Sequence, residues 1–382
     1  MDSQRLGDRR PSVALLGPGE DAWDRWLESA QCDVFHTADF HRYAGAKHGD
    51  PYLVVVGDRR RGFAWPYLLR PVVAAVASAH EMADVTSVYG YPGPVAWGCK
   101  PGDPFLTQAW AEIVFVWRQQ RVVSVFTRFH PLLGNAALLS GASAPAGIGG
   151  PGVVEAGTTI SIDLSAGVDA ARAAYAPDLR VRIASMRRKG VTTEASSDWS
   201  ELPTFARLYR ETMIRNGAAE FYFFDETDFR RLRAEVGDHV HLLVVRHRGN
   251  VIAAALFTDF NGIAQWYLAG SDSAANALSP TKVLIDDAVT WAEGRGNQVL
   301  HLGGGRGSRN DSLFWFKSRF SPRRHAFHTG RWIVDGPAYR VLSEARLAAL
   351  RDDETVDGGY FPAYRAPTIA GPDRPGRSDL RN

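Results

Sequence analysis

The segment GGGRGSRNDSLFWFKSRF, residues 303–320, places a lysine among aromatic residues directly after a glycine run. Asp311 is positioned to cap a short helix whose apolar face includes Leu313 and Phe316. Lys317 then projects from the same turn, either into a cleft or into solvent. In a cleft, its charge can stabilise the oxyanion that forms during acyl transfer. Residue types alone favour the alternative, a surface lysine that follows an aromatic core residue.

The glycine run itself, residues 303–307, follows a predicted strand and resembles a phosphate-binding loop. It has neither the GxxxxGK[ST] pattern nor the GxGxxG spacing. We expect these glycines to let the chain turn sharply beside a cleft. A nucleotide-phosphate loop stays the alternative.

Two basic clusters are candidates for contact with RNA phosphates, which attract such side chains without sequence preference. A solvated helix face is the alternative for both. The second cluster overlaps the segment of Lys317, which strengthens its case. The first cluster contains Arg180, Arg182, Arg187, Arg188 and Lys189, and the second contains Arg306, Arg309, Lys317, Arg319, Arg323 and Arg324.

The loop from 84 to 98, DVTSVYGYPGPVAWG, is rich in aromatic residues, glycine and proline. Tyr89, Tyr91 and Trp97 can line a substrate pocket, and Asp84 can hold the ammonium group of a substrate. Equally, the aromatic side chains can pack in a core and Asp84 can cap a turn.

Metal and triad chemistry find no support in the sequence. The histidines form no ligand-spaced cluster, and HExxH and GxSxG are absent. The two cysteines, Cys32 and Cys99, are too few for a disulfide framework, and we expect both to be small buried residues. We therefore predict no metal and no cofactor.

Hydrophobic periodicity predicts a mixed α/β chain in which two halves repeat one pattern. Each half has a helix, two strands joined by a short polar turn, and a helix that leads into another strand. Asn261-Gly262 is a hairpin signal, and Ser279-Pro280 is expected to cap and start a helix. The predicted helices are 20–30, 37–47, 104–120, 201–216 and 280–293, and the predicted strands are 52–56, 63–69, 122–129, 241–246, 251–260, 263–270 and 298–303.

At 382 residues, with 45% hydrophobic and 23% charged residues, two domains are the expectation. We assign residues 1–157 to a first domain, 158–335 to a second, and 336–382 to a C-terminal helix and a disordered tail that begins after Pro367. The Gly/Ala/Pro-rich stretch 134–157 is expected to be a linker.

The formal net charge of +2 argues against a surface that is basic throughout, so RNA contact requires a local patch. The N-terminus has no apolar run typical of a signal peptide. We expect a soluble, cytoplasmic monomer without a membrane partner.

Five segments resemble the Fem family of ligases and its GNAT-superfamily relatives. They occur in family order and together span most of residues 30–325. The last segment is the most specific, because it resembles the family's glycine run followed by D-x-L-x-x-F-K-x-x-F. The segments are CDVFHTADFHRYAGAKHG, DVTSVYGYPGPVAWG, RFHPLLGN, LYRETMIRNGAAEFYFF and LHLGGGRGSRNDSLFWFKSRFSP.

The resemblance implies two tandem GNAT-like domains of α/β (α+β) class with a cleft between them. The first would hold the acceptor and the second the donor. The Phe316–Lys317 pair matches a functionally important pair of the family, while Arg215 and Tyr222 match residues that face its cleft. Lys47 matches loosely a basic residue near the family's start and is expected to contact the acceptor.

Fem ligases move an amino acid from aminoacyl-tRNA to an amine, and the resemblance implies the same reaction here. The first-domain loop departs from the family's pattern, which favours an antibiotic intermediate over a cell-wall precursor as the acceptor. An acyl-CoA-dependent N-acyltransferase is the main rival. The stretch before residue 280 lacks the glycine spacing that such enzymes use for the CoA pyrophosphate, and Pro280 removes a backbone donor. A non-catalytic tRNA- or partner-binding protein is the second rival.

Overall fold

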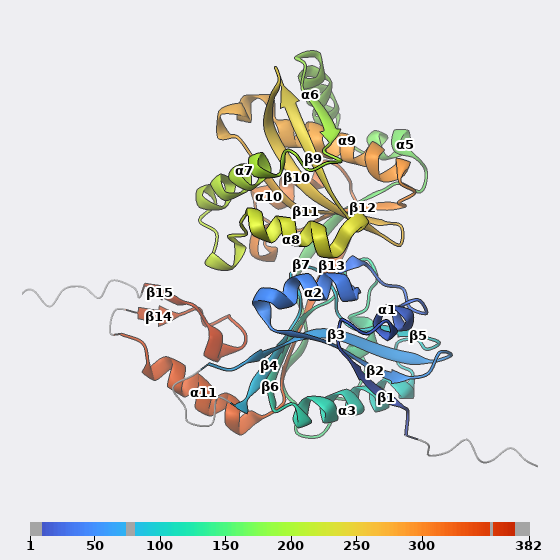
Figure 1. Ribbon diagram of the computed structural model, residues 1–382, viewed down its shortest axis with the longest axis vertical. Coiled ribbons are helices and arrows are strands. Elements are labelled where there is room, and N and C mark those ends of the chain that lie inside the picture. The colour runs from blue at the N-terminus through green and yellow to red at the C-terminus, as the bar shows by residue number, and fades with distance from the viewer. Residues whose placement is uncertain (1–9, 74–80, 352–353, 371–382) are drawn as a thin grey trace, which may run out of the picture.

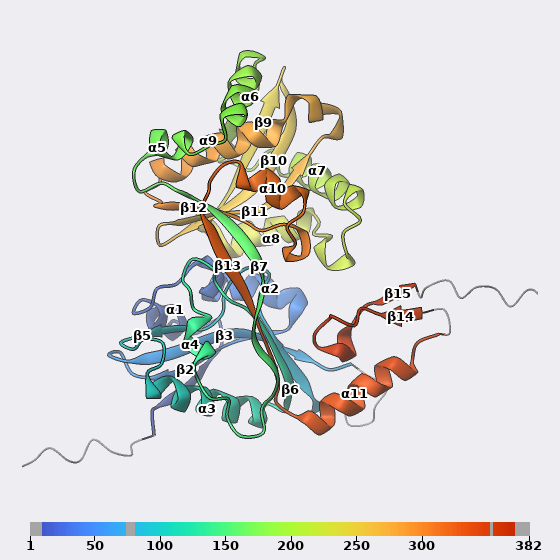
Figure 2. The ribbon, with the colours of Figure 1, turned by 180° about the vertical axis from the view of Figure 1, so that it is seen from behind.

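The computed structural model describes residues 10–73, 81–351 and 354–370, and consists of two lobes joined by a continuous 13-stranded sheet. The sheet order is β1-β2-β3-β4-β6-β13-β7-β12-β11-β10-β9-β8, with β5 beside β3. In both views of the ribbon, β7 and β13 run from one lobe into the other (Figures 1 and 2). The strands are β1 (Val13–Leu16), β2 (Asp50–Gly57), β3 (Gly62–Pro71), β4 (Ala83–Thr86), β5 (Val95–Trp97), β6 (Val122–Arg128), β7 (Gly149–Asp163), β8 (Thr192–Ala195), β9 (Val240–His247), β10 (Asn250–Phe260), β11 (Ile263–Ser271), β12 (Val299–Gly303) and β13 (Arg324–Ile333).

The two lobes repeat one topology, which confirms the prediction that the two halves of the chain share one pattern of helices and strands. β2–β3 and β9–β10 are the equivalent antiparallel hairpins, and each is followed by an antiparallel partner, β4 or β11. The next pairing is parallel in both lobes, β4 with β6 and β11 with β12. Both series end antiparallel, β6 with β13 and β12 with β7.

Helices cover the faces of the sheet, and the predicted helices are all present. The turn signals also hold in part. Asn261 and Gly262 both have positive φ in the two-residue turn between β10 and β11. The helices are α1 (Ala22–Leu27), α2 (Ala38–His48), α3 (Pro104–Gln119), α4 (Ala137–Ser140), α5 (Val168–Ala173), α6 (Pro177–Arg188), α7 (Leu202–Arg215), α8 (Glu226–Val236), α9 (Pro280–Gly294), α10 (Ser312–Ser318) and α11 (Gly336–Ala348).

Some local predictions are wrong. Ser279 does not cap α9, because its left-handed backbone (φ 44) turns the hydroxyl toward Arg182, whose Nε donates to it at 3.3 Å. The expected linker ends early, because Gly149 already begins β7. Cys32 is buried as expected, whereas Cys99 is half-buried.

The domain boundary expected after residue 157 falls inside β7, and the boundary after residue 335 follows β13. β13 pairs with β7 through Arg324–Ile333 and with β6 through its last five positions. We propose to keep these boundaries as the division into lobes, with β7 and β13 shared between them.

The C-terminal segment after α11 packs back onto the first lobe. Tyr364 lies in a small core with Leu342 of α11 and Val123 of β6. The tail predicted to be disordered contains β15 (Thr368–Ala370), which pairs with β14 (Glu354–Val356). The rest of that tail, residues 371–382, and the N-terminal residues 1–9 lie outside the described residues.

The lobes also meet through helices. Phe35 and Phe40 of the first lobe share one core with Phe205, Phe229 and Leu232 of the second. The two lobes are therefore joined by a common hydrophobic core as well as by the shared sheet.

Candidate active site

A cavity of about 1300 Å³ lies where the central strands of the two lobes meet, and side chains from both lobes line it. The parallel pair β11–β12 explains its position. These strands are paired only from Ile263–Gln265 to Val299–His301 and then separate. Residues after that point, including Trp266 on β11 and Gly303 on β12, line the opening between them.

Lys317 lies in this cavity as predicted. The Asp311 carboxylate accepts hydrogen bonds from the backbone N–H groups of Leu313 (3.1 Å) and Phe314 (3.0 Å), which fixes the first turn of α10. The Lys317 side chain is buried, and its Nζ donates to the Gly304 carbonyl oxygen at 2.7 Å. The alternative of a surface lysine is therefore excluded.

Burial also changes the charge state of this amine. Desolvation lowers the pKa of Lys317 from 10.5 to about 7, although the Asp311 carboxylate offsets part of the effect. The Nζ atom lies 5.0 Å from the centroid of the Trp266 ring, whose face favours the protonated form. Near pH 7 the Lys317 amine is therefore present in both its protonated and its neutral form.

The glycine run provides the space around this amine. Gly303 has φ +72, and a Cβ placed on it would lie 3.3 Å from Tyr91 Oη and 3.5 Å from Lys317 Nζ. A Cβ on Gly305 would collide with the Arg309 carbonyl oxygen and with Asp311. These glycines therefore form a sharp turn beside the cavity, as expected, and the hydroxyl of Tyr91 and the amine of Lys317 approach the same point.

Aromatic side chains form one wall of the cavity. The ring centroids of Tyr89 and Tyr222 are 5.4 Å apart, and those of Tyr91 and Phe327 are 5.3 Å apart. Burial raises the pKa of Tyr91 to about 12, so its hydroxyl stays a neutral donor at physiological pH. The structure thus brings Tyr89, Tyr91 and Tyr222 together with the Phe316–Lys317 pair.

A buried polar network lies beneath this wall. The Asp33 carboxylate contacts Nε2 of His130 at 3.0 Å and accepts a hydrogen bond from Nε2 of Gln265. The Gln265 Oε1 atom lies 2.8 Å from Nδ1 of His301. Because the Gln265 amide nitrogen is directed at Asp33, its oxygen accepts from His301, and the network joins the two lobes under the cavity.

Several predicted substrate residues lie elsewhere. Asp84 is buried and forms ion pairs with Arg70, at 2.7 Å, and with Arg365. Its carboxylate is therefore not available to bind the ammonium group of a substrate. Trp97 packs in the core of the first lobe and donates to the Asp58 carbonyl oxygen at 2.8 Å.

Two further predicted contacts serve other purposes. Lys47 forms an ion pair with Asp228 at 2.5 Å, which links α2 to α8 across the lobes. Arg215 donates to the Ser271 carbonyl oxygen at 3.1 Å, and only its neighbours on α7 reach the cavity. Neither side chain lines the cavity.

The two predicted basic clusters contain some residues at the cavity and others that lie away from it. Arg306 and Arg309 lie at the exposed side of the cavity. Arg306 also forms an ion pair with Asp311 at 2.8 Å. The other arginines of the second cluster are engaged away from the cavity, Arg319 with Asp178, Arg323 with Asp163, and Arg324 over the Phe314 ring. In the first cluster, Arg187 pairs with Asp286 and Asp287, Arg182 donates to the Ala277 carbonyl oxygen, and Arg180, Arg188 and Lys189 are exposed.

Sequence reasoning missed the far end of the cavity. Arg128, Thr329 and Arg331 line it there on β6 and β13, and Glu155 lines it on β7. Arg128 is the first residue of the predicted family segment RFHPLLGN. The strand VVSVFTR ends on this arginine, but one charge at a strand end has no distinctive spacing, so no signal in the sequence identified it.

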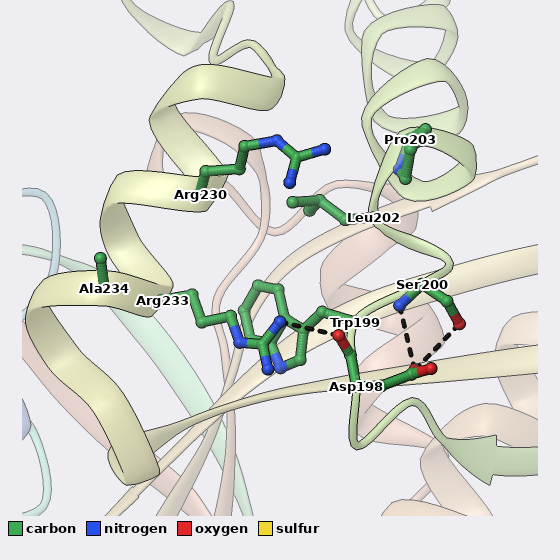
Figure 3. A pocket seen from close by; sticks show the side chains of 8 residues that line it. All are labelled: Asp198, Trp199, Ser200, Leu202, Pro203, Arg230, Arg233 and Ala234. Atoms are coloured by element: carbon green, nitrogen blue, oxygen red, sulfur yellow. Dashed lines mark hydrogen bonds between the residues drawn. The ribbon is translucent and has the colours of Figure 1, made fainter.

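A second hollow, of about 530 Å³, lies between the N-terminus of α7 and α8 (Figure 3). Arg233 donates to the Asp198 carbonyl oxygen at 2.8 Å and covers the Trp199 ring at 5.3 Å. The guanidinium of Arg233 is thus occupied by contacts within the protein, and we assign no chemistry to this hollow.

Within residues 10–73, 81–351 and 354–370, no group of three or more His, Cys, Asp and Glu side chains is arranged to hold a metal ion. In the same part of the chain, no helix is long and apolar enough to cross a membrane.

Comparison with known proteins agrees with this geometry. Residues 173–310 match the family model described as an acetyltransferase (GNAT) domain. The match ends just before Asp311, so it contains the splayed strands but not Lys317. No protein with a curated description matches the chain in sequence.

Among solved structures, FemX has a TM-score of 0.64 and 11% identity over 86% of this chain and 99% of its own. L-PGS from Bacillus licheniformis has a TM-score of 0.51 and 14% identity over 88% and 98%. A conserved protein of unknown function from Bacteroides thetaiotaomicron has a TM-score of 0.52 and 9% identity over 83% and 100%. These likenesses establish a two-lobed fold with a Fem-like architecture. The match of residues 173–310 to the GNAT acetyltransferase domain indicates an acyltransferase.

Proposed function

We propose that this acyltransferase moves an amino acid from aminoacyl-tRNA to the amine of a small-molecule acceptor, an antibiotic intermediate or a cell-wall precursor. The observation that carries the proposal is the buried Lys317, held on Gly304 in a cavity that both lobes line. The likeness of the fold to FemX supports it. The reaction would belong to the cytoplasm, with the chain acting as a monomer and without a cofactor.

In this reaction, the acceptor nitrogen attacks the ester carbonyl carbon of the aminoacyl group. A C–N bond forms, the carbonyl oxygen becomes an oxyanion, and the bond to the ribose oxygen then breaks. The departing ribose oxygen takes the proton that the amine releases. The chain holds the two reactants together, which is the larger part of catalysis for an ester that is already activated.

Lys317 is proposed to stabilise the oxyanion. As an ammonium group it donates one N–H to Gly304 and has two more available for substrate. Negative charge that develops nearby raises its affinity for the proton, so its stabilising charge is strongest in the transition state. The neutral hydroxyl of Tyr91, which approaches the same point, is a second donor for that oxygen.

The start of α9 favours tRNA over CoA as the donor. GNAT enzymes that use CoA bind its pyrophosphate on free backbone N–H groups at a helix N-terminus. Here Pro280 has no N–H, and the Lys282 N–H is bonded to the Ser279 carbonyl oxygen at 3.0 Å. Arg306 and Arg309, at the exposed side of the cavity, are proposed to contact the phosphates near the 3′ end of the tRNA.

An acyl-CoA-dependent N-acyltransferase is the second candidate, and the acetyltransferase family match favours it. The backbone N–H of Thr281 is the remaining donor of the first turn, and Thr281 lines the cavity. In that case the basic residues at the rim would be solvated surface.

The two candidates are distinguished by the donor. The purified protein would be incubated with a pool of charged, radiolabelled tRNAs or with acetyl- and longer acyl-CoAs, in each case with a panel of amines. Transfer that RNase treatment abolishes is the expected result. Transfer from a CoA thioester that RNase does not affect would replace the proposal by the second candidate.

A further inference from the structure

The far end of the cavity, in the first lobe, has a composition that the proposed transfer does not require. Arg128 ends β6, and its guanidinium lies 5.0 Å from the Phe126 ring centroid and 5.9 Å from that of Tyr89. Its one hydrogen bond in the described part of the chain is to the Ser87 hydroxyl, at a long 3.3 Å. No carboxylate lies within 4.0 Å of it among those residues.

The register of the sheet builds a patch around this arginine. Arg128 pairs with Thr329 on β13, and Phe126 pairs with Arg331. Side chains opposite each other on neighbouring strands share a face, about 5 Å apart, and diagonal ones lie about 7–8 Å apart. Arg331 is therefore the diagonal neighbour of Arg128, and the cavity is lined by all four side chains.

Two of these side chains have unused hydrogen-bonding groups. The Thr329 side chain is 4% exposed, and its Oγ1 has no partner among the described residues. The Nε atom of Arg331 is also buried without a partner there, and its guanidinium otherwise donates to the Gly359 carbonyl oxygen at 3.5 Å. Buried polar groups are normally satisfied, so such groups beside a cavity indicate a missing ligand.

The charges around the patch fit an anion. Two guanidinium groups on diagonal positions repel each other unless a negative group lies between them. Glu155 also lines the cavity, from β7, but forms no ion pair with either arginine in the described part of the chain. Arginine forks bind carboxylates and phosphates through two parallel hydrogen bonds.

We propose that Arg128, with Thr329 and Arg331, binds an anionic group of the acceptor, a carboxylate or a phosphate, while the acceptor's amine lies near Lys317. The inference rests on the proposed function for the role of acceptor. The anion site itself requires only that the ligand be an anionic amine. Tyr89 and Tyr91 line the cavity between Arg128 and Lys317 and would contact the part of the acceptor that joins its anionic group to its amine.

The test compares pairs of probes that differ only in the anion. Binding of glucosamine 6-phosphate and glucosamine, and of glycine and glycinamide, would be measured by calorimetry at constant ionic strength without any donor. Wild type is expected to bind the anionic member of at least one pair about tenfold more tightly. The pair that shows the preference identifies phosphate or carboxylate.

Variants assign the preference to the patch. Arg128→Gln is expected to reduce it to about threefold or less, and Thr329→Val to weaken it by a smaller factor. Arg207→Gln removes an exposed arginine of α7 that pairs with Glu211 at 2.9 Å, and is expected to leave it unchanged. Equal binding of both members of each pair by wild type, or an unchanged preference in Arg128→Gln, would overturn the inference.

The binding assay also separates this inference from the proposed function. A preference for anionic probes that Arg128→Gln removes, in a protein that transfers no amino acid, supports the anion site and rejects the aminoacyl transfer. If the protein transfers an amino acid to uncharged amines but shows no preference for anionic probes, the aminoacyl transfer is supported and the anion site is rejected.

Discussion

Replacing Lys317 by methionine should stabilise the protein while it removes activity. The substitution replaces the lysine by an unbranched apolar side chain that is one heavy atom shorter, and it removes the charge. At pH 7 the unfolded chain holds the lysine proton fully, whereas burial in the folded protein lowers the pKa from 10.5 to about 7 and leaves the amine half protonated. That difference corresponds to about 4 kcal/mol against folding. Loss of the hydrogen bond from the charged amine to Gly304 costs about 2 kcal/mol, so Lys317→Met should gain about 2 kcal/mol.

The pH dependence of this gain follows from the direction of the shift. Because the pKa of Lys317 is lowered in the folded protein, the penalty is fully present below about pH 7 and disappears as the pH rises toward the unfolded value of 10.5. The gain of Lys317→Met over wild type should therefore shrink steadily above pH 7.

Denaturant unfolding followed by tryptophan fluorescence, at several pH values, measures this difference. Lys100→Met, which removes an exposed lysine of the first lobe, is the matched control and should change stability little. The reasoning is refuted if Lys317→Met is less stable than wild type at pH 7, or if the difference between them does not vary with pH.

Three further outcomes are expected. Gly303→Ala should lose activity and about 1–2 kcal/mol of stability, because its φ of +72 and the nearby Tyr91 hydroxyl both oppose a Cβ. The control Gly134→Ala, with φ +61 and open space around it, should lose similar stability and stay active. With an acceptor amine that is neutral throughout, the single-turnover rate should fall as the pH rises above about 7, because Lys317 loses its proton, and a pH-independent rate would exclude its role as a cation. Arg309→Gln should raise the KM for aminoacyl-tRNA and reduce the slope of log affinity against log salt by about 0.7, whereas Arg340→Gln on α11 should do neither.

The sequence predicts the repeated pattern because that pattern is local. The hairpins β2–β3 and β9–β10 follow from short apolar runs separated by polar turns, and α9 follows from the proline at its start. The exchange of β7 and β13 between lobes was not predicted. It depends on pairings such as Arg324 with Ile160, more than 160 residues apart, which no local pattern encodes.

In the candidate site, too, the features within one segment could be predicted, and those that depend on distant residues could not. Lys317, its helix cap and the glycine turn lie within one segment, and the sequence places them correctly. Asp84 was misplaced because its partner Arg365 is 281 residues away in the chain. Arg128 was missed because its environment comes from three strands, and a single arginine at a strand end has no distinctive spacing.

The role of Lys317 in transfer is measured most directly by a single turnover of aminoacyl-tRNA bound to the protein with saturating acceptor. The expected result is a rate at least about a hundredfold lower in Lys317→Met than in wild type, with tRNA binding unchanged. Lys100→Met should react within about twofold of wild type. A wild-type rate in a folded Lys317→Met protein would contradict the proposal that the buried amine stabilises the transition state.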